Sequence, residues 1–490
     1  DVSEANSRHC FVFLEDMLMF YAARFFVGYD LLEARAFRIT RDADLYIDEE
    51  DAQDLVVEVE RQLKKRQRGQ AVRLEFEVGT SRFMRRFMTQ EMNLEKEDMY
   101  QIDGPLDMTV FFGFCGIKGY DHLRYPEAHP HSPWSMLELK RTPETNIFDM
   151  IREKDLLIHL PYESFDESVV NFLYSAANDK DVLAIKQTLY RVSSSSPVVQ
   201  ALEKAVQNGK QVTVLMEVKA RFDEANNILM ARRLEKAGAH VIYGLVGLKT
   251  HSKCTLVIRR EKDGIRRYVH VATGNYNAST AKLYTDLGIL TCSDRFGIDA
   301  SAFFNLLSGY SDPPIWDSFI VAPINLRQRC IELIDREIHF AKNGEDAHMI
   351  AKMNSLLDKG IIEKLYEASQ AGVKIELIVR GICVLIPGIP GVSDNITVRS
   401  IVGRFLEHSR IFWFRNGGRE ELYISSADWM PRNLNDRVEL MVPIEDPEIK
   451  RRLKQMVDIE LSDNQKAHIM QADGTWLKTI SAENQLCAQE

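Results

Sequence analysis

The sequence lacks the features that mark several large classes of protein. Its seven cysteines are odd in number and scattered, without a Cys-x-x-Cys pair of the kind that binds zinc or forms a redox centre. No apolar run approaches the roughly 18 residues of a bilayer-spanning helix, and residues 1–30 contain no secretory signal pattern. We therefore expect a protein of the reducing cytoplasm, with association at a membrane surface left open and no transmembrane segment.

An excess of positive charge is also absent. The formal net charge of -10 argues against a basic surface that coats nucleic acid, so nucleic acid is not an expected partner. A site for any polyanion must therefore be a local concentration of lysine and arginine. The 490 residues, 45% of them hydrophobic, are of ordinary globular composition and long enough for several domains.

From about residue 155 short β-branched runs alternate with helical segments, which predicts an α/β fold. We expect strands over 181–191 and 211–218, with a helix between them that begins at Pro197 behind the cap residue Ser196. The region before residue 138 is predicted to be a mixed α+β head domain with a charged helix over 48–70.

One block of this pattern occurs twice. ALEKAVQNGKQVTVLMEV at 201–218 aligns without a gap with KLYEASQAGVKIELIVRG at 364–381. A His-Ser-basic triplet follows each copy, so the order of motifs is the same in both halves. We infer an internal duplication that produces two similar α/β domains, at 138–318 and 319–490, after a head domain at 1–137.

The two triplets pair a histidine with a cation. On a strand, His251 and Lys253 would project from one face, as would His408 and Arg410. A buried cation requires an anion, and a phosphoryl group would be one, since neutral imidazole is a competent nucleophile. A half-exposed strand end explains a single copy better, but two copies at equivalent places favour the catalytic interpretation.

Further candidates for phosphate binding follow the apolar strands. Arg191, Arg221 and Arg380 each come just after such a strand, where open α/β sheets bind ligands, and a guanidinium suits phosphate oxygens. Downstream of each histidine a strand runs into a polar turn. In the first copy that turn offers Asn275 and Asn277 as phosphate contacts, although a turn needs no function to exist.

Nine motifs, in this order, resemble the bacterial polyphosphate kinases: HLPYESFD (159–166), AIKQTLYR (184–191), ARFDEANN (220–227), GLKTHSK (247–253), TGNYNASTAKLYTDLG (273–288), AKMNSL (351–356), RGIC (380–383), GRFLEHSR (403–410) and SSADWMPRN (425–433). RITRDADLYIDEEDA at 38–52 extends the resemblance into the head domain. The small helical domain with which that family usually opens is not found here.

The resemblance implies reversible transfer of the ATP γ-phosphate to the end of inorganic polyphosphate, through a phosphohistidine and with Mg²⁺. His251 would be the phosphorylated nucleophile, with Lys253 beside it, and His408 would act as acid or base and contact the nucleotide. Tyr284 and Arg380 match nucleotide-binding positions. ATP, ADP and polyphosphate would be the partners, and the enzyme would be a dimer.

Arg191 and Arg221 match positions that the family assigns to Mg²⁺-phosphate binding. A guanidinium cannot ligate a cation, so we expect both to hold phosphates that carry the metal.

Two other functions stay open. Duplicated His-x-basic motifs also occur in the phospholipase D superfamily, where an Asp stands five residues after the lysine. Ile258 and Arg415 occupy that place here, which counts against phosphodiester hydrolysis while leaving the shared phospholipase-D-like fold in place. The alternatives are therefore a phosphodiesterase or nuclease of that fold and a non-catalytic polyanion-binding protein.

Overall fold

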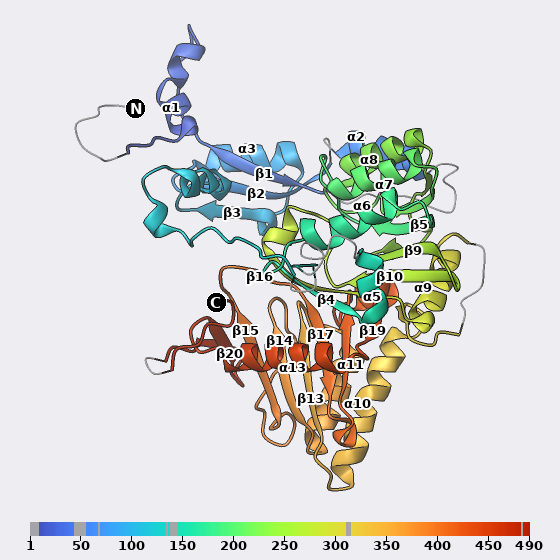
Figure 1. Cartoon of the computed structure of the whole chain (residues 1–490). Helices are drawn as coiled ribbons and strands as arrows, with labels where there is room; N and C mark the ends of the chain where they lie inside the picture. The colour runs from blue at the N-terminus through green and yellow to red at the C-terminus, as the bar shows by residue number, and fades with distance from the viewer. Residues whose placement is uncertain are drawn as a thin grey trace. The chain divides into compact units, whose positions relative to one another are not determined.

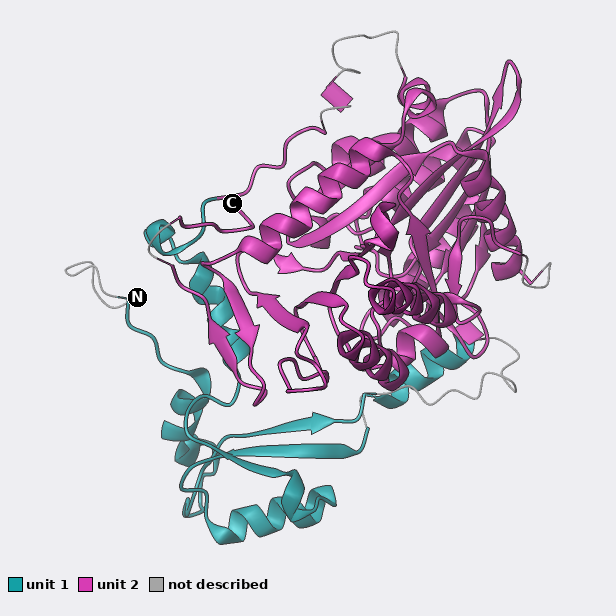
Figure 2. Cartoon of the chain, turned by 90° about the horizontal axis from the view of Figure 1, so that it is seen from below, with its two compact units in different colours: residues 1–48, 57–126 teal, residues 49–56, 127–490 magenta. Residues whose placement is uncertain are grey.

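The computed structural model describes residues 9–43, 55–66, 69–133, 136–137, 146–309, 315–481 and 484–490. The chain divides into two compact units, residues 1–48 with 57–126 and residues 49–56 with 127–490 (Figure 2). The helix expected over 48–70 is described as α2 (Leu55–Arg66). Residues 48–54 of the expected range lie outside the described residues. All seven cysteines are free thiols. Within the described ranges, no helix combines the length and apolar composition needed to cross a bilayer.

The first unit contains a small mixed sheet. Strand β2 (Ala71–Glu77) pairs antiparallel with β1 (Phe37–Arg41) and parallel with β3 (Met99–Ile102). Helix α3 (Arg82–Met92) begins where the Ser81 side chain accepts a hydrogen bond from the Met84 amide. A small apolar core holds these elements together, as expected for a mixed α+β domain.

The second unit contains two sheets that repeat one strand order. The first runs β7 (His240–Ile242), β6 (Gln211–Met216), β5 (Val182–Leu189), β9 (Cys254–Glu261), β10 (Gly264–Ala272), β11 (Tyr284–Thr291) and β4 (Leu156–Leu160). The second runs β15 (Ile396–Ile401), β14 (Lys374–Val379), β13 (His348–Met353), β17 (Arg410–Phe414), β18 (Glu421–Ser425), β19 (Arg437–Pro443) and β12 (Ile320–Ala322). In each, the first three strands are parallel and the later pairings antiparallel. The predicted duplication of an α/β domain is confirmed by this shared topology.

Helices cover both faces of each sheet (Figure 1). Helices α7 (Pro197–Gln207) and α8 (Glu224–Ala237) contact the first sheet at β6, and α7 begins behind Ser196 as predicted. Helices α10 (Leu326–Lys342) and α11 (Lys359–Gln370) pack on one face of the second sheet. The other face of the second sheet shares a core with the first sheet, α9 (Asp294–Leu307) and α13 (Pro447–Ser462). The two repeats are therefore joined through one buried interior.

The strands of the second repeat supply both of these cores by alternation. Met349 and Ala351 of β13 face α10 and α11, whereas Ile350 between them faces the core shared with the first repeat. Each such side chain is at most 1% exposed, and burying it contributes roughly 1.5–3 kcal/mol for a residue the size of Met or Ile. This double burial fixes the strand ends from which the candidate site is built.

Candidate active site

Each histidine lies where the chain passes from the sheet of one repeat to the sheet of the other. Strand β8 (Lys249–Thr250), just before His251, pairs with β19 of the second repeat. Strand β16 (Leu406–Glu407), just before His408, pairs with β11 of the first repeat. The expectation that histidine and cation share one strand is wrong, because residues 251–253 precede β9 and His408 precedes β17. The reason is that this short segment must bridge two sheets.

A buried carboxylate of the opposite repeat orients each imidazole. Nδ1 of His251 lies 2.9 Å from Oε2 of Glu439 in β19, and Nδ1 of His408 lies 2.9 Å from Oδ1 of Asp286 in β11. Since a carboxylate only accepts, Nδ1 carries the proton and Nε2 of each ring is left for chemistry. Sequence reasoning missed both carboxylates, although Asp286 lies within the motif TGNYNASTAKLYTDLG.

The surroundings of both imidazoles favour the neutral form. Burial lowers the pKa of His251 well below its ordinary value, and the positive charges of Lys253, Arg437 and Arg410 lower it further. The pKa of His408 is also lowered by burial, against the opposing effect of Asp286. Residues of the second repeat thus act on a histidine of the first, so the structure brings the two histidines into one site.

The two cations beside the histidines differ in their neighbours. Arg410 is buried and donates to both carboxylate oxygens of Asp428, at 3.1 and 3.2 Å. Lys253 is equally buried, but its ammonium group donates to the carbonyl of His251 and lies 5.5 Å from the centre of the Tyr190 ring. Burial lowers the pKa of Lys253 to about 7. Among the described residues, no carboxylate forms an ion pair with Lys253.

Strand register explains this difference. Lys253 is opposite Ala272 at the end of β10, just as Arg410 is opposite Ser425 at the end of β18. Three residues further along, Asp428 of the second repeat therefore corresponds to Asn275 of the first. The carboxylate that neutralises Arg410 is replaced by an amide, whose buried Oδ1 has no hydrogen-bond partner in the part of the chain that the structure describes.

The predicted nucleotide residues gather around His408. The Tyr284 ring lies 5.1 Å from the His408 ring, centre to centre. Arg380 follows β14 and donates through Nε and Nη2 to Oδ1 of Asn354, at 3.0 and 2.8 Å. Asn354 in turn donates to the carbonyl of His408 at 3.3 Å, so a chain of hydrogen bonds runs from Arg380 through Asn354 to His408.

The arginines predicted for Mg²⁺-phosphate binding lie past the ends of β5 and β6. Arg191 forms an ion pair with Asp223 at 2.9 Å and donates to the carbonyl of Arg221 at 3.0 Å. Asn277 donates to the carbonyl of Arg191 at 3.4 Å, and its Oδ1 accepts from two backbone amides of the following turn. Its observed bonds are those of a turn residue.

The described residues contain no cluster of three or more His, Cys, Asp or Glu side chains that could hold a metal ion.

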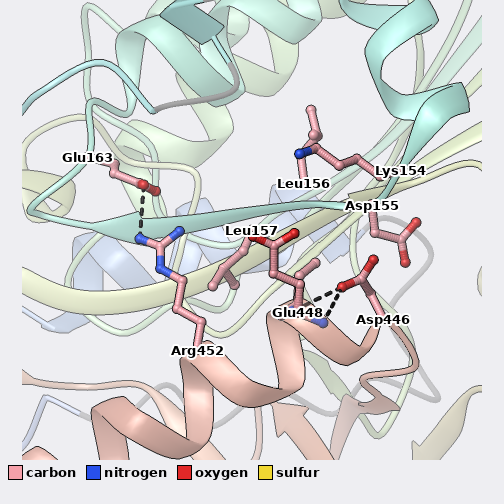
Figure 3. A pocket seen from close by; sticks show the side chains of 9 residues that line it. Lys154, Asp155, Leu156, Leu157, Glu163, Asp446, Glu448 and Arg452 are labelled. Atoms are coloured by element: carbon pink, nitrogen blue, oxygen red, sulfur yellow. Dashed lines mark hydrogen bonds and ion pairs between the residues drawn. The ribbon is translucent and has the colours of Figure 1, made fainter.

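A separate cavity of about 210 Å³ lies between β4 and α13 (Figure 3). Glu163 and Arg452 form an ion pair across it at 3.0 Å, and Asp446 caps the start of α13 at its rim. None of the predicted site residues lines this cavity. It is therefore distinct from the histidine site.

Comparison with known proteins identifies the family. Three family models match consecutive parts of the chain: the polyphosphate kinase middle domain at residues 2–114, its C-terminal domain 1 at 146–313 and its C-terminal domain 2 at 319–489. The chain is 52% identical over 465 residues to the polyphosphate kinase of Halalkalibacterium halodurans, covering 94% of this chain and 65% of that protein. It is 50% identical over 482 residues to that of Bacillus anthracis, covering 97% and 68% respectively.

A crystal structure of polyphosphate kinase from Porphyromonas gingivalis superposes with a TM-score of 0.84 at 33% identity, covering 97% of this chain and 69% of that one. The chain thus spans about two thirds of the length of these relatives. On the three matched models and these identities, the chain belongs to the polyphosphate kinase family.

Proposed function

We propose that this chain transfers the γ-phosphoryl group of ATP to the end of inorganic polyphosphate, reversibly and through a phosphohistidine on His251. The observation that supports it most is a single buried site with two carboxylate-oriented neutral imidazoles. Family membership supplies the substrates, because the names of the relatives specify a kinase acting on polyphosphate.

The difference between the two cations supports His251 as the nucleophile. Lys253 has no ion-pair partner among the described residues and can donate to the incoming phosphoryl oxygens, whereas the charge of Arg410 is already met by Asp428. An anionic group is therefore attracted to the His251 side of the site. His408, beside Tyr284 and Arg380, is left to contact the nucleotide and to act as acid or base.

In the first step, the Nε2 lone pair of His251 attacks the γ-phosphorus, the bond from that phosphorus to the bridging oxygen breaks, and ADP leaves. The ring becomes positively charged while Nδ1 keeps its proton, and Glu439 stabilises that charge. In the second step, a terminal oxygen of polyphosphate attacks the phosphorus, the P–N bond breaks, and neutral imidazole is restored. Mg²⁺ enters as part of the ATP substrate, with Arg191 and Arg221 as the proposed contacts of its phosphates.

Other predictions stay proposals. We infer that the domains divide at about residues 137 and 318, that Lys253, Arg410, Asn275 and Asn277 contact phosphate, and that the enzyme works as a cytoplasmic homodimer. The phosphodiesterase alternative has no support at the position where that superfamily carries Asp. Ile258 packs against the core shared by the repeats, and Arg415 forms an ion pair with Asp346 at 3.2 Å.

Rapid-quench labelling with γ-³²P-ATP tests the proposal. We expect base-stable, acid-labile label on the wild-type chain, its chase into added polyphosphate, and no label on His251→Ala. The control is His348→Ala, because His348 also contacts a carboxylate, Glu376 at 2.7 Å, but lies outside the site. Label on His251→Ala would contradict the assignment. Cleavage of a phosphodiester without ATP would favour the phosphodiesterase, and polyanion binding without ADP release would favour a binding protein.

A further inference from the structure

Arg380 is held by a neutral group. Its guanidinium donates twice to the amide oxygen of Asn354, and no carboxylate of the described residues forms an ion pair with it. Nearby Arg410, by contrast, is paired with Asp428. Arg380 is half-buried, and both burial and the charge of Arg410 lower its pKa. The charges of Asp428 and Glu407 act in the opposite direction, but neither carboxylate contacts the guanidinium directly, so among the described residues its direct partner is an amide.

Asn354 is fixed from both sides. Its side chain is buried, and its Nδ2 donates to Oδ1 of Asp428 at 3.2 Å and to the carbonyl of His408 at 3.3 Å. Its backbone amide donates to the same Asp428 oxygen at 2.7 Å. Because Nδ2 must face these acceptors, Oδ1 must face Arg380. The amide thus connects Arg380 rigidly to the Arg410–Asp428 pair beside His408.

We propose that Asn354 is a positioning residue that presents Arg380, as a cation held by an amide and not by a carboxylate, to a chain of phosphate groups. The inference rests on the proposed function for the nature of this ligand. An aspartate in this place would accept the same two hydrogen bonds but would neutralise the guanidinium. An amide supplies the geometry without that neutralisation, which is what a phosphate-binding arginine requires.

Calorimetric binding of inorganic tripolyphosphate over a series of salt concentrations tests this proposal. At a pH where the introduced carboxyl is ionised, Asn354→Asp is expected to raise Kd by about 10- to 100-fold, as for a lost charge-assisted contact. The slope of log K against log salt is expected to fall in magnitude by about 1, because one cation is lost from the site. Asn354→Ala is expected to bind a few-fold more weakly with an unchanged slope, because Arg380 loses its support but keeps its charge.

A matched control exists in the first repeat. Oδ1 of exposed Asn305 accepts from Lys186 at 3.5 Å, so Asn305→Asp places the same new charge beside a cation away from the site. Its affinity and salt slope are expected to equal those of the wild type. Thermal unfolding establishes that each variant is folded.

Wild-type affinity and slope in Asn354→Asp would overturn the proposal. Equal losses in both Asn354 variants with unchanged slopes would overturn it too, because they would show a structural role only. If Asn354→Asp does not fold, Asn354→Ala decides: weaker binding by a variant that unfolds at the wild-type temperature supports the proposal, and wild-type binding or a general loss of stability refutes it. Since binding needs no turnover, a wild-type chain that transfers no phosphoryl group would refute the proposed function without affecting this comparison. In an active chain, Asn354→Asp should raise KM for ATP more than it lowers kcat.

Discussion

Removing the charge of Glu439 should separate catalysis from stability. Glu439 is fully buried, and its carboxylate accepts from His251 Nδ1 and from the Ser426 hydroxyl. The substitution Glu439→Gln keeps the size and one acceptor oxygen. It removes the negative charge that faces the ring when phosphoryl transfer makes His251 cationic.

The expected magnitude follows from Coulomb's law. With about 5 Å between the carboxylate and the charge on the ring, and an effective dielectric constant of about 20, the lost interaction is about 3 kcal/mol. The rate of His251 phosphorylation should fall on the order of 10²-fold. Burial raises the pKa of Glu439, so its charged form is costly to bury, and the free energy of unfolding should change little.

Rapid-quench labelling with γ-³²P-ATP measures this rate, and urea denaturation measures stability. Glu376→Gln is the matched control, because Glu376 makes the same kind of contact with His348 outside the site. We expect wild-type labelling from that control. Wild-type labelling by Glu439→Gln would refute the role of the carboxylate, and a large loss of stability would show that the carboxylate acts structurally.

Two further predictions concern pH. Because the pKa of Lys253 is lowered to about 7, the rate of phosphoryl transfer should decline as pH rises through that value. In a pH–rate profile, Lys253→Arg should move this decline to higher pH. An unchanged profile would show that Lys253 does not cause the decline. Lys352 contacts both Glu407 and Glu460, and burial raises the pKa of Glu460 from 4.5 to about 7. The folded state therefore binds more protons between these values, so stability should fall from pH 4.5 to about 7, and Glu460→Gln should remove this fall in urea titrations.

The duplicated fold could be predicted because its signals are local. Ser196 followed by Pro197 marked the start of α7, and the alternation of apolar runs with helices marked the strands on either side. The repeated block at 201–218 and 364–381 then implied a second copy of the same topology. None of these steps requires knowledge of which residues meet across the fold.

The orienting carboxylates could not be predicted in this way. Glu439 lies 188 residues from His251, and Asp286 lies 122 residues from His408. The pairings that bring them together, β8 with β19 and β16 with β11, contain two residue pairs each. A two-residue strand leaves no periodic pattern in the sequence, so the exchange between repeats becomes visible only in three dimensions.

Duplication alone would make the two halves of the site equivalent, whereas phosphoryl transfer requires one nucleophile and one assisting group. The differences at corresponding positions remove the equivalence. Asn275 of the first repeat corresponds to Asp428 of the second. By strand register, Glu217 of the first repeat corresponds to Arg380 of the second. The carboxylate of Glu217 accepts a hydrogen bond from the Thr250 amide at 2.7 Å. The first repeat thus uses its strand-end charge to fix the backbone just before His251, and among the described residues it gives Lys253 no ion pair. The second repeat pairs Arg410 with Asp428, whereas Arg380 donates to an amide. Each half therefore presents one cation to phosphate: Lys253 beside the proposed nucleophile, and Arg380 toward the nucleotide.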